Sequence, residues 1–150
     1  MCRVGDILRP EWIACRDDSA DRETLVTRLA ALLEPAAGVP THAVVEAVKE
    51  RERFGTTAIG HGVALPHCRI AAASGLLLAA ATLVRPVSFD APDGEGVRLA
   101  FLIVVPEGNN LRYLKLLSRM SVLCGDRAIH ERLMAARDAA EFLGMLKEAA

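Results

Sequence analysis

The sequence predicts a layered α/β domain, in which helices pack around one β-sheet. Three observations favour this fold class. Apolar residues recur at helical spacing near both ends of the chain, over residues 21–34 and 111–146. Two continuous apolar runs, residues 76–89 and 97–107, lie between these helical patterns. The chain has 150 residues, enough to bury one hydrophobic core, so we expect residues 1–150 to form a single domain.

Two helices are predicted in the first third of the chain. Residues 21–34 carry leucines at helical spacing, and Pro35 and Gly38 are expected to end this helix. A second pattern of the same kind covers residues 41–53 and stops before Gly55. The expected N-caps of these two helices are Ser19 and Thr41.

The two central apolar runs are predicted to be strands that are buried on both faces. Residues 76–89 and 97–107 are too short and too continuous for amphipathic helices. The segment that separates them, DAPDGEG, consists of turn-forming residues. Three helical patterns follow, and the last begins with Asp138 and Glu141 at the spacing of a capping box.

Composition and charge argue against several classes of protein. The net charge of −1 lacks the basic excess of a nucleic-acid-binding surface. The longest apolar run, residues 76–84, is about half of the roughly 20 residues that a membrane-spanning helix needs. No secretory leader is recognisable at the N-terminus. We therefore expect a soluble, cytoplasmic protein that does not insert into membranes.

The cysteines do not form a recognisable site. Cys2, Cys15, Cys68 and Cys124 show neither a CxxC pair nor the spacing of zinc ligands. A chain with this much apolar core also has little need of a disulfide framework. We interpret the four thiols as reduced packing residues and expect no metal site.

The stretch GTTAIGHGVALPHCRI, residues 55–70, concentrates residues suited to binding an anion. Gly60 and Gly62 allow another molecule to approach the main chain, and successive exposed N–H groups form a concave anion site. The hydroxyl of Thr57 and the guanidinium of Arg51 would add donors to such a site. We therefore expect the loop to lie beside the reactive group that follows it.

His67 is the candidate for that reactive group. Pro66 restricts the backbone before it, so His67 is expected at the end of a short strand over residues 63–65. A neutral imidazole attacks phosphorus without prior deprotonation, since its unperturbed pKa is about 6.5. The protein then only positions the group and stabilises charge on the phosphoryl oxygens. The residues alone leave a structural turn with a hydrogen-bonded histidine as the alternative.

The same residues resemble the phosphorylation-site motif of the type-2 enzyme IIA family (mannitol/fructose/nitrogen type) of the bacterial phosphotransferase system. That motif is Arg-Glu, then Ser-Thr-Gly-Ile-Gly-x-Gly-x-Ala-x-Pro-His, and it is similar to Arg51-Glu52 and TTAIGHGVALPH (56–67) here. The likeness extends to residues 86–107 and 114–123. It implies a three-layer sandwich with a mixed β-sheet flanked by helices on both faces. It implies no metal and no organic cofactor.

By this resemblance, His67 is the phosphoryl acceptor and receives its group from a histidine phosphocarrier protein, HPr or a nitrogen-type homologue. The chain would then be a phosphotransferase component with a phosphohistidine intermediate. Arg51 and Thr57 take catalytic roles beside it. The further candidates for contact with phosphate are Gly60, His61, Gly62 and Tyr113. For His61, a solvent-facing position in the loop is the alternative.

Two positions depart from the family pattern. Ala58 stands where the family usually has glycine. Tyr113 stands where many members carry a second histidine, before Leu-Lys-Leu-Leu. A phenol can hydrogen-bond to the ring of His67 or to a phosphoryl oxygen, but it cannot become a cation.

Three functions are compatible with these features. The first is a regulatory, nitrogen-type phosphorelay protein, which a freestanding domain without a membrane segment resembles most. The second is a sugar-specific IIA transport subunit that passes phosphate to a IIB domain. The third is an interaction module that is not phosphorylated, which Tyr113 makes conceivable. The partners would be the phosphocarrier and either a regulatory target or a IIB domain.

Overall fold

The computed structural model describes residues 3–108 and 110–149. The strands are β1 (Ile13–Asp17), β2 (Ala58–Gly60), β3 (Val63–Ala64), β4 (His67–Arg69), β5 (Leu77–Val87) and β6 (Val97–Val105). The α-helices are α1 (Val4–Ile7), α2 (Arg22–Ala37), α3 (Thr41–Glu52), α4 (Asn110–Gly125), α5 (Arg127–Ala135) and α6 (Ala139–Ala149). A short 3-10 turn, η1 (Pro10–Trp12), precedes β1.

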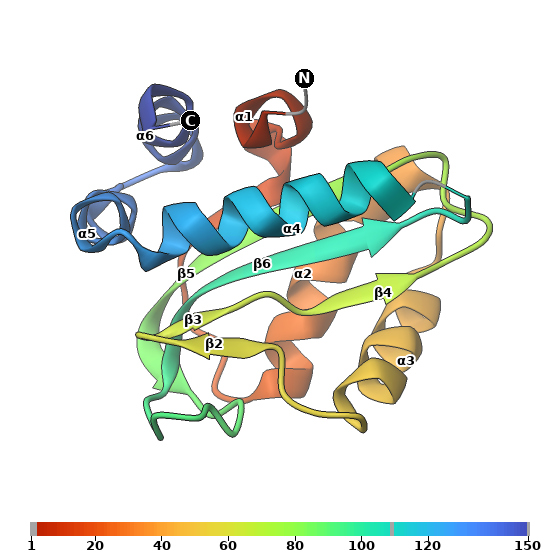
Figure 1. The fold of residues 1–150 in the computed structure, drawn as a ribbon, viewed down its shortest axis with the longest axis horizontal. Coiled ribbons are helices and arrows are strands. Elements are labelled where there is room, and N and C mark those ends of the chain that lie inside the picture. Colours follow the sequence, from red (N-terminus) through yellow and green to blue (C-terminus); the bar gives the residue numbers. More distant parts are fainter. Residues whose placement is uncertain (1–2, 109, 150) are drawn as a thin grey trace.

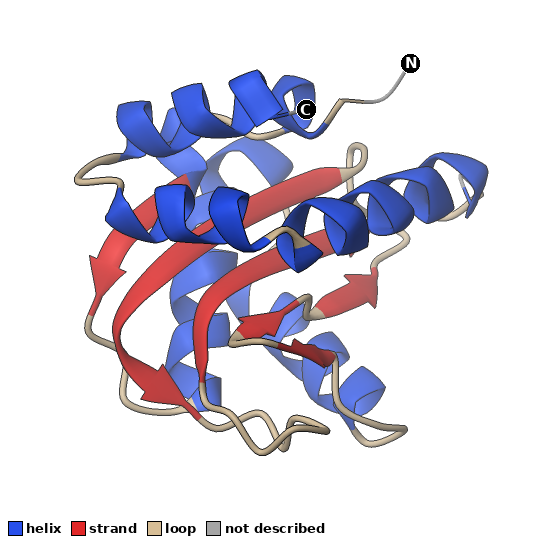
Figure 2. Cartoon of the chain, turned by 60° about the vertical axis from the view of Figure 1, so that its left-hand side comes forward, coloured by secondary structure: helices blue, strands red, loops and turns tan. Residues whose placement is uncertain are grey.

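The strands form one mixed sheet in the order β1-β5-β6-β3-β2, with β4 also paired to β6. β1 runs parallel to β5, and β3 and β4 run parallel to β6. The pairs β5–β6 and β2–β3 are antiparallel. Helices α2 and α3 cover one face, and α4 with α5 and α6 covers the other (Figure 1). Figure 2 shows the long strands between these two helical layers, which confirms the predicted mixed three-layer α/β sandwich.

The core is built on β5 and β6, as the two apolar runs predicted. Every side chain of β6 except that of Arg98 is buried, so this strand is covered on both faces. β5 is buried from Leu77 to Leu83 and exposed over residues 84–86, next to the turn that joins it to β6. Helix α6 packs onto the sheet partly through Phe142, whose ring centroid lies 6.0 Å from that of Phe101 in β6. Within the described residues, no helix combines the length and apolarity needed to cross a membrane.

The predicted caps need correction at α2. Asp21 caps this helix, because its carboxylate accepts the N–H of Thr24 at 2.7 Å. Ser19 lies outside the helix and hydrogen-bonds to the buried Asp17 instead. Asp21, which immediately precedes the helix, is therefore the N-cap, and Ser19 is not.

Of the two residues expected to end α2, Gly38 is confirmed and Pro35 is not, and the expected cap at Thr41 also differs from the structure. α2 continues past Pro35 to Ala37, and Gly38, whose backbone is left-handed (φ 65°), caps it by donating its N–H to the carbonyl of Glu34. Thr41 is the first residue of α3 and its hydroxyl donates to the same Glu34, so Pro40 occupies the cap position. A carboxylate from the preceding helix thus replaces a local cap.

The expected helix start at Asp138 is confirmed, because its carboxylate accepts the N–H of Glu141 at 2.9 Å. The cysteines in the described part of the chain, Cys15, Cys68 and Cys124, are free thiols. Burial raises the pKa of Cys68 and of Cys124 to about 12, so both are neutral at pH 7. Cys2 lies outside the described residues.

Candidate functional site

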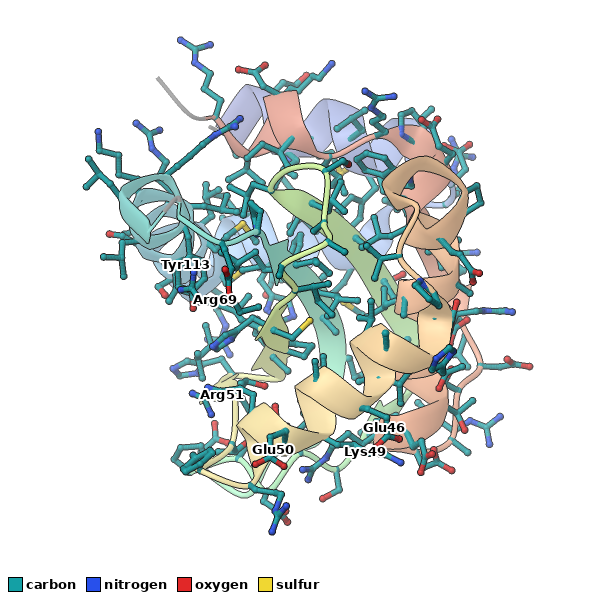
Figure 3. All side chains as sticks on the ribbon, turned by 90° about the vertical axis from the view of Figure 1, so that its right-hand side faces the viewer. Glu46, Lys49, Glu50, Arg51, Arg69 and Tyr113 are labelled. Atoms are coloured by element: carbon teal, nitrogen blue, oxygen red, sulfur yellow. The ribbon has the colours of Figure 1, made fainter. Side chains whose placement is uncertain are left out.

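An open pocket of about 430 Å³ surrounds the side chain of His67. Helix α3, strand β4 and helix α4 contribute to its wall, so segments far apart in the sequence meet there. Figure 3 shows Arg51, Arg69 and Tyr113 on the same side of the molecule. The residues that line this His67 pocket are Ala47, Glu50, Arg51, Phe54, His67, Cys68, Arg69, Val105 and Tyr113.

The sheet fixes the position of His67. This residue begins β4 and pairs with Ile103 of β6, whereas the sequence placed it at the end of the preceding strand. The carbonyl of Pro66 accepts the N–H of Ile103 at 2.9 Å, which ties the chain to β6 just before the histidine. His67 is half-buried and its neighbour Cys68 is buried, as alternation along a strand requires. The imidazole is therefore held at a rigid point of the backbone.

The hydrogen bonds of the His67 ring define its tautomer. Nδ1 lies 2.9 Å from the carbonyl oxygen of Leu65, which only accepts, so Nδ1 carries the proton. Nε2 lies 3.2 Å from Nε of Arg51, which only donates, so Nε2 presents a lone pair. Both contacts fit the neutral ring with the proton on Nδ1. The unprotonated nitrogen of the imidazole is therefore Nε2, whose lone pair accepts the Nε–H of Arg51.

Burial lowers the pKa of His67 from its ordinary value of 6.5. The hydrogen bond from Nδ1 to the Leu65 carbonyl opposes this shift in the pKa, and the nearby charge of Arg51 adds to it. Glu52 acts in the opposite direction, through its negative charge. Because burial is the largest of these effects, the neutral imidazole predominates at pH 7.

The lowered pKa predicts how His67 responds to acid. Its ring should stay neutral below pH 6.5 and gain a proton only as the pH falls through the folded-state pKa. At a pH between the folded-state pKa and 6.5, His67 is protonated in the unfolded chain but not in the folded one, which favours unfolding. The contribution of His67 to stability is therefore fully present above pH 6.5 and is lost as the pH falls through the folded-state pKa. An NMR titration of the His67 ring checks this. A midpoint at or above 6.5 would contradict it.

Two guanidinium groups lie in the wall of the His67 pocket. Arg51 comes from the last turn of α3, and its Nη1 donates to the carbonyl of Gly55 at 3.0 Å, which orients the side chain. Arg69 comes from β4, two residues after His67, so it lies on the same face of the strand. Planar guanidinium groups bind phosphate-like anions through paired N–H donors. The pocket therefore combines a nucleophilic nitrogen with donors for an anion.

Tyr113 faces the same pocket from α4. Its ring centroid lies 5.8 Å from that of His67 at an angle of 45°, and the guanidinium carbon of Arg69 lies 6.0 Å from it. Burial raises the pKa of Tyr113, although Arg51 and Arg69 oppose the shift. The phenol is therefore protonated at pH 7 and can donate a hydrogen bond to an anion beside His67.

The glycine-rich turn does not lie where the sequence placed it. Gly60, His61 and Gly62 have backbone φ values of 90°, 55° and 77°, and they form the tight turn between β2 and β3. None of them lines the His67 pocket; His61 and Gly62 line a different pocket, next to His130. The left-handed conformations serve the hairpin, and these two glycines contribute nothing to the lining of the His67 pocket. His61 is exposed, and its N–H donates to Asp93 at 2.9 Å.

Thr57 is not among the residues that line the His67 pocket. The residue is buried, and its hydroxyl donates to the carboxylate of Glu52. Its backbone N–H points to the same carboxylate, at 3.4 Å. The expected hydroxyl donor to phosphate is therefore already engaged, and Thr57 connects the end of α3 to the strand that follows.

Of the predicted site residues, the structure brings His67, Arg51 and Tyr113 together. Sequence patterns did not single out Arg69 or Phe54, which also line the pocket. Arg69 could have been found, since it stands two residues after His67 in an extended segment. In the described part of the chain, no cluster of histidine, cysteine or carboxylate side chains has the geometry to hold a metal ion.

Comparison with known proteins places this site in a family. Residues 6–149 match the family described as phosphoenolpyruvate-dependent sugar phosphotransferase system, EIIA 2. A nitrogen regulatory protein of Bradyrhizobium diazoefficiens is 35% identical over 143 residues, which cover 95% of this chain and 94% of that protein. A phosphotransferase-system fructose-specific EIIA component of Haloferax volcanii is 30% identical, over 89% and 87% of the two chains.

The fold agrees with this assignment. The crystal structure of the nitrogen regulatory protein IIA-Ntr from Neisseria meningitidis superimposes with a TM-score of 0.90 at 33% identity. The match covers 95% of this chain and 98% of that structure. Sequence and fold therefore agree over nearly the whole length, and the chain belongs to the EIIA type-2 family of the phosphoenolpyruvate-dependent sugar phosphotransferase system.

Proposed function

We propose that this chain is a single-domain phosphorelay protein of the cytoplasm, whose His67 accepts a phosphoryl group from a histidine phosphocarrier protein. One observation carries the proposal: the lone pair of Nε2 faces a pocket that holds two guanidinium groups and a neutral phenol. The tautomer needed for attack is present before any partner binds, because Nδ1 bonds to the carbonyl of Leu65. Membership of the EIIA type-2 family supports the same function.

The chemical step requires only the lone pair of His67. Nε2 forms a bond to phosphorus while the bond between phosphorus and the donor imidazole breaks, and the donor nitrogen keeps that electron pair. Nδ1 keeps its proton and its bond to Leu65, so the charge that develops on the ring is stabilised by the carbonyl dipole. No base is needed to activate the nucleophile.

Arg51 has two successive roles in this step. In the unphosphorylated protein its Nε–H occupies the lone pair of Nε2, so the guanidinium must move aside for phosphorus to approach. It then lies within reach of the phosphoryl oxygens, where its charge favours the transition state. Arg69 and Tyr113 are placed to bind the remaining oxygens from β4 and α4.

A regulatory role of the nitrogen type is the version of this function that we favour. Relatives of both kinds exist, since the chain is similar to nitrogen regulatory proteins and to a fructose-specific EIIA component. Tyr113 supports the regulatory role, because a phenol can stabilise a phosphorylated state but cannot tune the imidazole by becoming a cation. A sugar-specific subunit that passes phosphate to a IIB domain is the second candidate.

Transfer assays and partner capture distinguish the candidates. With phosphoenolpyruvate, enzyme I and a histidine phosphocarrier protein, the chain should acquire an acid-labile, base-stable phosphoryl group. A regulatory partner should distinguish the free from the phosphorylated form by at least ~1 kcal/mol, because up to about two negative charges are added to the pocket. Tyr113→His should accelerate transfer and leave this discrimination intact. Rapid transfer to a IIB domain, with no partner that senses phosphorylation, would favour the transport role instead.

A further inference from the structure

We propose that Glu52 is a positioning residue for His67, and that it acts by keeping the carbonyl of Leu65 available to Nδ1. This inference rests on the proposed function, since it concerns how the acceptor imidazole is prepared. Glu52 adjoins Arg51 at the end of α3 and is not among the residues that line the His67 pocket. Besides the effect of its charge on the pKa of His67, Glu52 is therefore expected to act on the ring indirectly, through the backbone.

Glu52 is a carboxylate held inside the protein by specific partners. Its side chain is only 7% exposed, and it accepts the N–H of Thr57 at 3.4 Å together with the hydroxyl of the same residue. Nη1 of Arg22 lies 3.6 Å from it. Arg22 is itself fixed by a 2.9 Å bond to Asp90 and by the ring of Phe89, 5.0 Å below its guanidinium carbon. A carboxylate this buried needs such partners to remain charged.

The partner that matters for His67 is the backbone N–H of Thr57. Ala58 and Ala64 are opposite each other in the β2–β3 pair, so Thr57 is opposite Leu65. The N–H of Leu65 donates to the carbonyl of Thr57 at 3.0 Å. In a hydrogen-bonded antiparallel pair, the two opposite residues normally exchange both bonds, so the N–H of Thr57 would donate to the carbonyl of Leu65. Here the N–H of Thr57 is turned to Glu52 instead.

The carbonyl of Leu65 accepts the Nδ1–H of His67 at 2.9 Å, while the N–H of Thr57 points to Glu52 and does not share this carbonyl. Without Glu52, the N–H of Thr57 would be free to complete the strand pair and to compete for that carbonyl. The His67 ring would then lose its anchor, and its proton could reside on Nε2, where it removes the nucleophilic lone pair. Arg51 and Glu52, which are neighbours in the chain, thus control the two nitrogens of one imidazole.

The test measures the tautomer of His67 and the rate of phosphorylation in the same variants. We expect Glu52→Ala to lower the fraction of His67 with the proton on Nδ1, seen in the ring ¹⁵N chemical shifts of the unphosphorylated protein. Phosphorylation by enzyme I and the phosphocarrier should slow by roughly 10- to 100-fold, as when a supporting residue misplaces a reacting group. Glu52→Gln keeps one acceptor oxygen and should restore part of both properties.

Glu46→Gln is the matched control, because Glu46 lies on the same helix and its side chain is 73% exposed. This variant should keep the wild-type tautomer and rate. Thr57→Val removes the hydroxyl that holds the Glu52 carboxylate and should shift the tautomer in the same direction as Glu52→Ala. If Glu52→Ala does not fold, the tautomer measured in Thr57→Val tests the role of Glu52 in its place.

Wild-type ¹⁵N shifts and rates in the folded Glu52 and Thr57 variants would overturn the proposal. A loss of thermal stability without a change of tautomer would also overturn it, because it would show that Glu52 only supports the fold. The ¹⁵N measurement needs no phosphoryl donor. If the wild-type protein is not labelled at His67, the proposed function fails, while the tautomer result still decides the role of Glu52.

Discussion

Replacing His67 with alanine is expected to abolish phosphorylation, leaving only the background label. The variant loses the only imidazole among the residues that line the pocket, and no other nucleophile there is ready to replace it. The adjacent Cys68 is buried with its pKa raised to about 12, so its thiol is not ionised at pH 7. The measurement is the transfer of labelled phosphate from phosphoenolpyruvate through enzyme I and the phosphocarrier.

His61→Ala provides the control for this variant. His61 is exposed at the β2–β3 turn and does not line the His67 pocket, so most of the label should remain. A label that survives His67→Ala, or one that disappears in His61→Ala, would place the acceptor elsewhere. Circular dichroism should show that both variants are folded, since neither side chain is part of the buried core.

Replacing Arg51 with alanine should slow phosphorylation by roughly ten- to a thousand-fold, the range for loss of one charge-stabilising donor. Its Nε lies 3.2 Å from Nε2 of His67 and donates to the lone pair of that nitrogen. Removing the charge also removes one of the effects that lower the pKa of His67. The rates should therefore be compared near pH 8, where the imidazole is neutral in both proteins, so that the difference reports transition-state stabilisation.

Two further variants make the Arg51 result specific. Arg51→Lys keeps the charge but loses the planar pair of donors, so we expect a rate between those of wild type and Arg51→Ala. Arg53→Ala removes a nearby guanidinium that is 75% exposed and pairs with Glu50, and it should leave the rate unchanged. Equal rates for wild type and Arg51→Ala would mean that the backbone and the other pocket residues bind the phosphoryl group without this side chain.

The elements that could be predicted from the sequence are those whose local residue pattern reflects their burial in the fold. β5 and β6 are continuous apolar runs, and such runs are typical of strands covered on both faces. β1, with the sequence IACRD, was not predicted, because it has neither a continuous apolar run nor a clean alternation. It becomes a strand through its parallel pairing with β5, a contact between distant segments that local patterns do not contain.

The difference between local patterns and contacts of distant segments also explains which site residues could be predicted. His67, Arg51 and Tyr113 were found through a motif, and the structure brings them together. The glycines were misplaced because a left-handed backbone suits a tight hairpin as well as an anion site, and composition cannot distinguish the two. The connection from Glu52 to His67 was not predicted, since it depends on which amide pairs with which carbonyl.

The alignment of β4 with β6 has a chemical consequence. His67 is opposite Ile103 and Cys68 is opposite Val104, and the side chains of a strand alternate between its two faces. Sliding β4 by a single position would exchange the two faces: the thiol would take the outward position of the imidazole, and the imidazole would turn into the core. The pairing of β4 with β6 therefore decides whether an imidazole or a thiol is presented to the pocket, so a change of register would alter the chemistry of the site without replacing any residue in it.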